Sequence, residues 1–350
     1  MTKIGVARIV YELDFKLNTD FTFETSRVYT VSDVEFKILF PKEGVLPEKL
    51  SGIAIAEEKS CPYGYLIIDS TFNLEPYDSL LEGSAKIRPQ LLVIHGILTF
   101  LTNKVFITFQ GFPRVQSIVE QHIKVNSDQK KLIVNRNNRK NDLEKILTEI
   151  NNSNQEKRTL IFTLFERWRK ALHFEEESED SFLYFDESVL AYIHVLEVLA
   201  DEYTKELSAE IKRRKKDLIN EILSCTGDSG DKNIKKIGTL LNQLNSNQVT
   251  LKSKIIQMLK EFGLYSLKSD AIISRFIAHR NSIAHGRKNL YQDKVVFPLK
   301  PFFSFIKDID ENTETIKVLS ARTISSYLGL NAWDAEWKSV LLNELSPISL

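Results

Sequence analysis

The feature that most constrains this chain is a long stretch without the two residues that break helices. No proline occurs between Pro113 and Pro298, and no glycine occurs between Gly111 and Gly227. Proline removes a backbone donor and clashes with the preceding turn, and glycine costs conformational entropy inside a helix. A chain that avoids both residues over such a length is expected to be helical there. We therefore predict a helical domain over residues 141–350.

Capping residues and apolar periodicity place the individual helices. Asn141 and Asp142 can begin the first one, and Ser269 and Asp270 are expected to cap a later one. The helices that we expect cover residues 141–150, 157–174, 181–224, 232–245, 251–262 and 269–285, with two or three more after Pro301.

The first part of the chain has a different pattern. Runs of β-branched and aromatic residues, several of them alternating with polar residues, are bounded by turn residues. The runs that predict strands are residues 21–23, 27–31, 34–40, 52–56, 64–68 and 105–109, whereas 84–101 fits either a strand or a buried helix. The sequence thus predicts an α+β protein: a β-rich domain over 1–125, a basic polar linker over 126–140, and the helical domain.

Charge is balanced over the whole chain but not along it. The 47 basic and 47 acidic residues give a formal net charge of zero, which excludes a polycation that coats nucleic acid along its whole length. Residues 175–202, however, hold ten acidic residues and no lysine or arginine, and residues 203–300 hold 19 basic against 9 acidic residues. The second segment favours a phosphate-rich partner.

Several other classes of protein are not indicated. No apolar run is long enough to span a membrane, and the first residues do not form a signal peptide. Cys61 and Cys225 are too few for a disulfide framework. We expect a cytoplasmic protein that does not associate with a membrane.

Most catalytic signatures are missing from the sequence. It contains no phosphate-binding glycine loop, no H-E-x-x-H and no C-x-x-C motif, and its six histidines show no metal-ligand spacing. We therefore expect neither a metal ion nor a cofactor.

One polar cluster near the end of the helix expected over 269–285 can carry chemistry. Arg280 lies three and four residues after Ile277 and Phe276, within the apolar stripe of that helix. Its guanidinium there needs a counter-charge or an anionic ligand. Asn281 and His285, four residues apart, share one edge of the helix. Geometry alone leaves a second interpretation open, in which Arg280 reaches the surface and His285 caps the helix.

Glu197 is the predicted counter-charge for Arg280. It lies on a stripe with Leu190 and Ile193, where a lone carboxylate would be costly. A pairing of Glu197 with Arg280 would neutralise both groups and fix the orientation of the arginine. The alternative is that Glu197 faces solvent in a helix already rich in acidic residues.

The segment Arg280-Asn281-Ser282-Ile283-Ala284-His285 resembles the signature of the HEPN superfamily of helical, nucleotide-binding domains. That signature is an arginine and a histidine separated by four to six residues, the first of which is often polar. Here four residues intervene, asparagine takes the polar place, and Gly286 follows the histidine as in many members. The resemblance covers about residues 140–300. It does not extend to the predicted β-rich domain over 1–125, which resembles no family that we recognise.

The resemblance implies a metal-independent endoribonuclease, because many members cleave RNA by attack of the 2′-hydroxyl on the adjacent phosphate. His285 would be the general acid or base and Arg280 would hold the phosphate oxygens. Asn281 would orient His285 or contact the phosphate, while Arg287 and Lys288 would bind RNA. His279 is a weaker candidate for a helper, because it points away from Arg280 on a helix.

One histidine per chain is few for proton transfer on both oxygens, so the resemblance also implies a homodimer with a composite site. The protein would then be an antiviral or toxin-type effector, with a regulatory ligand or protein acting at the N-terminal domain. Two alternatives stay open: a non-catalytic HEPN module that binds nucleotide or mediates dimerisation, and a helical scaffold with a chance motif.

Overall fold

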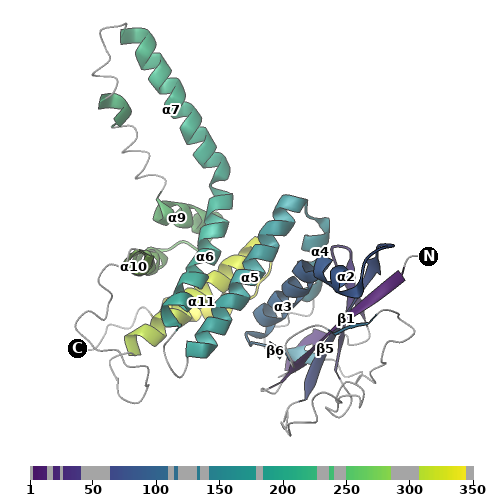
Figure 1. The fold of residues 1–350 in the computed structure, drawn as a ribbon. Coiled ribbons are helices and arrows are strands. Elements are labelled where there is room, and N and C mark those ends of the chain that lie inside the picture. The colour runs from purple at the N-terminus through teal and green to yellow at the C-terminus, as the bar shows by residue number, and fades with distance from the viewer. Residues whose placement is uncertain are drawn as a thin grey trace. The chain divides into compact units, whose positions relative to one another are not determined.

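The computed structural model describes residues 3–13, 19–23, 27–40, 64–108, 114–116, 132–134, 142–178, 184–226, 236–239, 250–284 and 307–343. The chain divides into two compact units, Met1–Glu176 and Glu177–Leu350. The first contains a β-sheet with helices, and the described part of the second is helical (Figure 1). The predicted α+β class is therefore confirmed. The domain boundaries near residues 125 and 141 stay a prediction, since the compact units meet at Glu176.

The first unit is built on a six-stranded antiparallel sheet. Its order is β3 (Val28–Val31), β4 (Val34–Leu39), β5 (Tyr65–Leu74), β1 (Lys3–Glu12) and β6 (Ile107–Thr108), and β7 (Arg114–Gln116) also pairs with β1. In β4 the buried residues Val34, Phe36 and Ile38 alternate with exposed ones, the pattern of a strand with one covered face. Most of β5 is buried, as its central place requires.

Among the described strands, β1, β7 and β8 (Leu132–Val134) were not predicted from the sequence. β1 nevertheless forms the long central pair with β5, in which Arg8 lies opposite Asp69. Those two side chains form a buried ion pair with Nε–Oδ1 and Nη2–Oδ2 distances of 2.6 and 2.7 Å. β8, within the predicted linker, pairs with β2 (Thr19–Phe23). The strand predicted at 52–56 lies outside the described residues.

The ambiguous segment 84–101 is helical. It spans the end of α2 (Leu80–Lys86) and most of α3 (Arg88–Thr102). α2 begins with a capping box, in which the side chains of Ser79 and Glu82 each accept a hydrogen bond from the other's backbone N–H. α3 lies against the sheet, where the rings of His95 and Tyr11 are 5.0 Å apart. Burial, with the nearby charge of Arg169, lowers the pKa of His95 to about 3, and burial raises the pKa of Tyr11.

Two further helices complete the first unit. α4 (Asp142–Asn152) and α5 (Gln155–Ser178) match the predicted helices at 141–150 and 157–174 closely. Asn151 joins α4 to the β3–β4 hairpin, because its Nδ2 donates to the Thr30 carbonyl (3.0 Å) and its Oδ1 accepts from the Ser32 N–H (2.7 Å).

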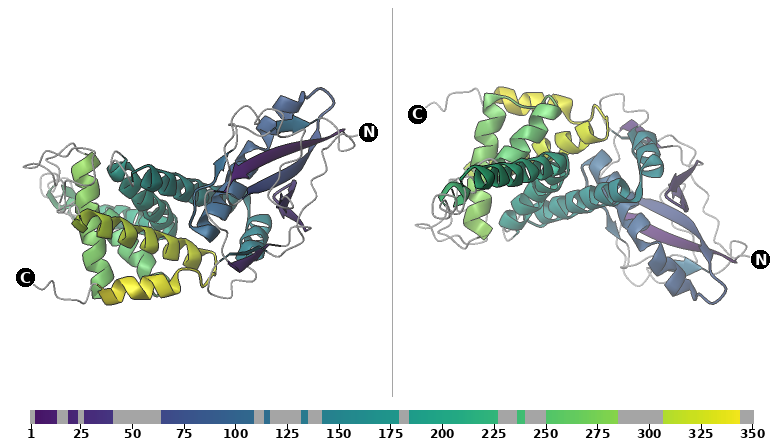
Figure 2. Two further views of the ribbon diagram at one scale, coloured as in Figure 1. Left: turned by 90° about the horizontal axis from the view of Figure 1, so that it is seen from below. Right: turned by 90° about the horizontal axis from the view of Figure 1, so that it is seen from above.

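The second unit is an assembly of helices around α6 (Phe185–Tyr203), which Figures 1 and 2 show beside α11 (Lys307–Tyr327). The other helices with described bounds are α7 (Lys205–Thr226), α9 (Leu251–Glu261), α10 (Leu267–Ala284) and α12 (Asp334–Asn343). α6 buries an almost continuous apolar face, and the Ser320 hydroxyl of α11 donates to the Tyr192 carbonyl at 3.0 Å. Among the described residues, no helix is long and apolar enough to cross a membrane.

The single long helix predicted over 181–224 is wrong, because α6 ends and α7 begins at Thr204. The Thr204 hydroxyl donates to the Ala200 carbonyl at 2.7 Å, and its backbone lies at φ −100° and ψ 4°. The Thr204 N–H donates to the same carbonyl at 3.0 Å. Because Thr159 inside α5 and Thr323 inside α11 make the same hydroxyl contact within continuous helices, this bond alone does not end a helix. The beginning of the predicted segment, 181–183, lies outside the described residues.

Candidate functional site

α10 carries the arginine that the sequence singled out. The helix begins at Leu267, and the serines at 266 and 269 cap it reciprocally: the Ser269 N–H donates to Ser266 Oγ (3.1 Å) and the Ser266 N–H to Ser269 Oγ (2.7 Å). The helix thus begins two residues before the predicted start at residue 269, and Ser269 takes part in its cap from the first turn. Beyond them, α10 buries Ile273 and Phe276, which sets the face on which Arg280 lies.

Arg280 and Glu197 meet, as the sequence predicted. Arg280 Nε donates to Glu197 Oε1 at 3.1 Å, and Arg280 Nη1 donates to Asn281 Oδ1 at 3.3 Å. The side chains of Arg280 and Glu197 are 30% and 18% exposed. Glu197 lies between the buried Ile193 and Ala200 on α6, so the guanidinium supplies the counter-charge that a carboxylate on an apolar face needs. The guanidinium is thus held by its Nε edge, and the arginine side chain is partly exposed.

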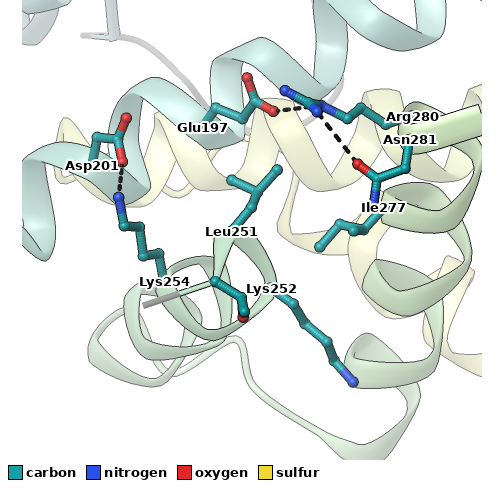
Figure 3. Close-up of a pocket in the computed structure, with 9 residues that line it drawn as sticks. Glu197, Asp201, Leu251, Lys252, Lys254, Ile277, Arg280 and Asn281 are labelled. Carbon is teal, nitrogen blue, oxygen red and sulfur yellow. Dashed lines mark hydrogen bonds and ion pairs between the residues drawn. The ribbon is translucent and has the colours of Figure 1, made fainter. Parts of the chain in front are cut away.

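Beside this pair lies an open pocket of about 640 Å³ (Figure 3). α6 contributes Glu197 and, one turn later, Asp201. The remaining lining residues come from the start of α9 and the end of α10: Thr250, Leu251, Lys252, Lys254, Ile277, Arg280 and Asn281. Acidic, basic and apolar side chains from α6, α9 and α10 therefore line the same pocket.

Two lysines of the pocket were not singled out by the sequence. Lys254 Nζ lies 2.6 Å from Asp201 Oδ1, and Lys252 Nζ lies 3.3 Å from Asp270 Oδ2. The one sequence signal was the spacing of Asp201, four residues after Glu197 and hence on the same face of the helix. Nothing in the sequence indicated that the start of α9 would face that acid.

His279 lies apart from this pocket, as its helical position predicted. Its Nε2 is 3.4 Å from Asp186 Oδ1, and its ring contacts that of Phe185, with centroids 6.3 Å apart. Asp186 is about three turns before Glu197 on α6. His279 therefore lies beside the carboxylate of Asp186 and not beside Arg280.

Three of the predicted site residues, His285, Arg287 and Lys288, lie outside the described residues. Among the residues that the structure does describe, no group of three or more His, Cys, Asp or Glu side chains could hold a metal ion. On α7, which lies in the basic segment 203–300, Arg213 and Arg214 are exposed and both pair with Glu210, at 2.6 and 2.7 Å.

Comparison with known proteins assigns a family to the part of the chain that holds this site. No curated protein and no solved structure matches the chain. Residues 190–300 match the family model described as Apea-like HEPN, whereas the N-terminal region matches none. The matched range contains Glu197, the whole Arg280–His285 motif and every lining residue of the pocket. The resemblance to the HEPN superfamily that the motif indicated is therefore confirmed over residues 190–300, a segment similar to the Apea-like HEPN family.

Proposed function

We propose that the helical unit is a metal-independent endoribonuclease of the HEPN type. The observation that carries the proposal is the state of Arg280. Within the matched HEPN segment, Glu197 holds its guanidinium at the rim of an open pocket. Besides the Nε donor to Glu197 and one Nη1 donor to Asn281, its N–H groups have no partner among the described residues. An arginine has five donors, so the others can bind phosphate oxygens.

In the proposed reaction the ribose 2′-hydroxyl attacks the adjacent phosphorus, and the bond to the 5′-oxygen of the next nucleotide breaks. The products are a 2′,3′-cyclic phosphate and a 5′-hydroxyl. His285 takes the proton of the attacking hydroxyl or gives one to the leaving oxygen. Arg280 stabilises the negative charge that builds up on the phosphate oxygens. Asn281, which already contacts Arg280, helps to orient the phosphate or His285, and Arg287 and Lys288 bind the flanking RNA.

Both proton transfers need a group of their own, and the motif supplies a single histidine. We therefore propose a homodimer in which two motifs face one cleft, so that one His285 acts as base and the other as acid.

The test is an RNA cleavage assay in EDTA, with the products analysed for 2′,3′-cyclic phosphate ends. Arg280→Ala and His285→Ala should each lower the rate by about 10²- to 10⁴-fold. Arg275→Ala, which removes an exposed arginine from the same helix, is the matched control and should retain activity. Cleavage that survives both site substitutions would overturn the proposal.

A second function is favoured by the same contacts. Because Arg280 donates to a carboxylate and an amide of its own chain, it also suits a non-catalytic HEPN module that binds nucleotide or mediates dimerisation. A folded dimer that binds RNA or nucleotide without cleaving any RNA would support this alternative.

In the cell we propose a toxin-type or antiviral effector, whose activity the first unit controls by sensing a ligand or a protein. Induced expression in bacteria should then arrest growth with the wild-type chain and not with Arg280→Ala at equal protein level. Equal growth arrest by both chains would contradict this role for the site.

A further inference from the structure

We propose that the pocket beside Arg280 is a subsite for the nucleotide next to the scissile phosphate, with Lys252 and Lys254 holding that nucleotide's backbone phosphate. This inference rests on the proposed ribonuclease function, because it places the pocket on the path of the RNA. It adds to the Arg280–His285 motif a second phosphate contact, made by a different helix.

The geometry of α9 and α10 supports two phosphate contacts. Arg280 comes from the end of α10, whereas Lys252 and Lys254 come from the first turn of α9, and all three line the same pocket (Figure 3). Thr250 caps α9 by accepting from the Ser253 N–H at 3.2 Å, so the helix begins at the pocket with its positive end. Consecutive phosphates of a single strand can therefore meet cations supplied by separate elements.

The two acidic residues of the pocket differ in how strongly they pair with these cations. Glu197 is 18% exposed and fixes Arg280, a positioning contact. Asp201 is 64% exposed and contacts Lys254, which is itself 25% exposed. A largely exposed carboxylate contributes little to such a pair, so a phosphate can replace it at Lys254. Lys252 contacts Asp270, which is not among the lining residues, and is 40% exposed.

The size and lining of the pocket suit a nucleotide. About 640 Å³ lies within the range of roughly 300–1,000 Å³ that is typical of small-molecule sites. Leu251, which Figure 3 shows between the Asp201–Lys254 and Glu197–Arg280 pairs, and Ile277, beside Asn281, give the pocket an apolar part against which a sugar or base can pack. No described aromatic residue lines the pocket, so base-specific stacking is not expected there.

The experiment measures binding separately from cleavage. The probe is a fluorescent single-stranded RNA with 2′-O-methyl groups throughout, which cannot undergo attack by a 2′-hydroxyl. Its Kd is measured by anisotropy at several salt concentrations, with the full-length protein. The variants are Lys252→Ala, Lys254→Ala and the double substitution. The control is Lys338→Ala, which removes an exposed lysine that pairs with Asp334 on α12.

Each lysine substitution should raise the Kd, and the double substitution should raise it about three- to tenfold. The slope of log K against log salt should become shallower by about 0.7 for each phosphate that the protein no longer neutralises. Asp201→Asn should have the opposite effect on the Kd. It removes the carboxylate that pairs with Lys254, so the Kd should fall. Lys338→Ala should change neither the Kd nor the slope.

The result that overturns the subsite is a double lysine variant with the Kd and salt dependence of the wild type. If the wild type at the same time cleaves unmodified RNA through Arg280, the proposed function stands and only the subsite fails. If instead the wild type cleaves no RNA and the lysine variants still bind more weakly, the pocket is a nucleic-acid site of a non-catalytic module.

Discussion

At the residue scale, the pair formed by Arg280 and Glu197 illustrates how partial burial gives a surface charge a structural role. An ion pair in full solvent is weak because water screens it, and a pair in a dry interior must repay a large desolvation cost. Exposures of 30% and 18% place this pair between the two limits. The contact can hold the arginine in one orientation while part of its guanidinium faces solvent.

A double-mutant cycle tests that orientation without any assay of activity. Glu197→Gln and Arg280→Gln, alone and together, should give a coupling free energy of about 0.5–1.5 kcal/mol in the free energy of unfolding, after allowance for solvent screening. The control is the exposed pair of Asp334 and Lys338 on α12, whose coupling should be about 0.3–0.5 kcal/mol, as for other i,i+4 pairs. A coupling for Arg280 and Glu197 no larger than the control would mean that Glu197 does not position the arginine.

The sequence could identify Glu197 because a carboxylate on an apolar helical face needs a partner, and Arg280 was the unpaired cation on another such face. It could not identify Lys254 as the partner of Asp201, because both are ordinary solvent-facing residues in the sequence. Only the packing of α9 against α6 brings them together.

At the scale of elements, helix ends and close helix contacts depend on single side chains. Thr204 follows the last residue of α6, and Ser266 precedes the first residue of α10, where Ser266 and Ser269 cap the helix reciprocally. In the first unit α3 and α5 approach closely at Gly96. A Cβ added at Gly96 would lie 2.8 Å from both the Cβ and the carbonyl oxygen of Phe165, so a side chain there must push the helices apart.

Gly96→Ala should therefore destabilise the first unit by about 1–3 kcal/mol, the usual cost of overpacking a core. Gly238→Ala is the control, because no atom of the described residues lies within 4 Å of a Cβ at Gly238, which is also helical. That control should be neutral or stabilise the chain by up to about 1 kcal/mol. Urea denaturation of both variants measures the difference, and equal stabilities would show that the α3–α5 contact is looser than the structure describes.

At the scale of the whole molecule, each of the two compact units has its own tryptophan residues, whose fluorescence reports unfolding, and the first unit has a histidine with a shifted pKa. Trp168 is fully buried in the first unit, and Trp333 and Trp337 belong to the second. His95 lies in the first unit with a pKa lowered to about 3. Unfolding can thus be followed separately in each unit of the full chain.

Lowering the pH should weaken the first unit through His95. Below pH 6.5 the histidine takes up a proton in the unfolded state but stays neutral in the folded one, so its stabilising effect is present above pH 6.5 and is lost as the pH falls toward 3. Between about pH 7.5 and 5 the loss is about 2 kcal/mol. Denaturation followed by Trp168 fluorescence, with Trp333 and Trp337 replaced by Phe, measures it.

His95→Asn should remove this part of the pH dependence from the Trp168 signal. In the converse background, Trp168→Phe, the same substitution should leave the transition of the second unit unchanged. A Trp168 transition with equal pH dependence in both proteins would show that His95 is not held neutral.

The sequence by itself determined the α+β class, most of the helices and the arginine motif. These follow from local rules: the absence of proline and glycine, apolar periodicity, and the cost of a charge on an apolar face. It missed β1, whose strand character depends on its place between β5 and β6. It also missed the interruption between α6 and α7 at Thr204, which no proline or glycine marks. Only the tertiary structure joined α6, α9 and α10 into one pocket, because contacts between residues some 50 to 80 positions apart in sequence are decided by how helices pack and not by any pattern along the chain.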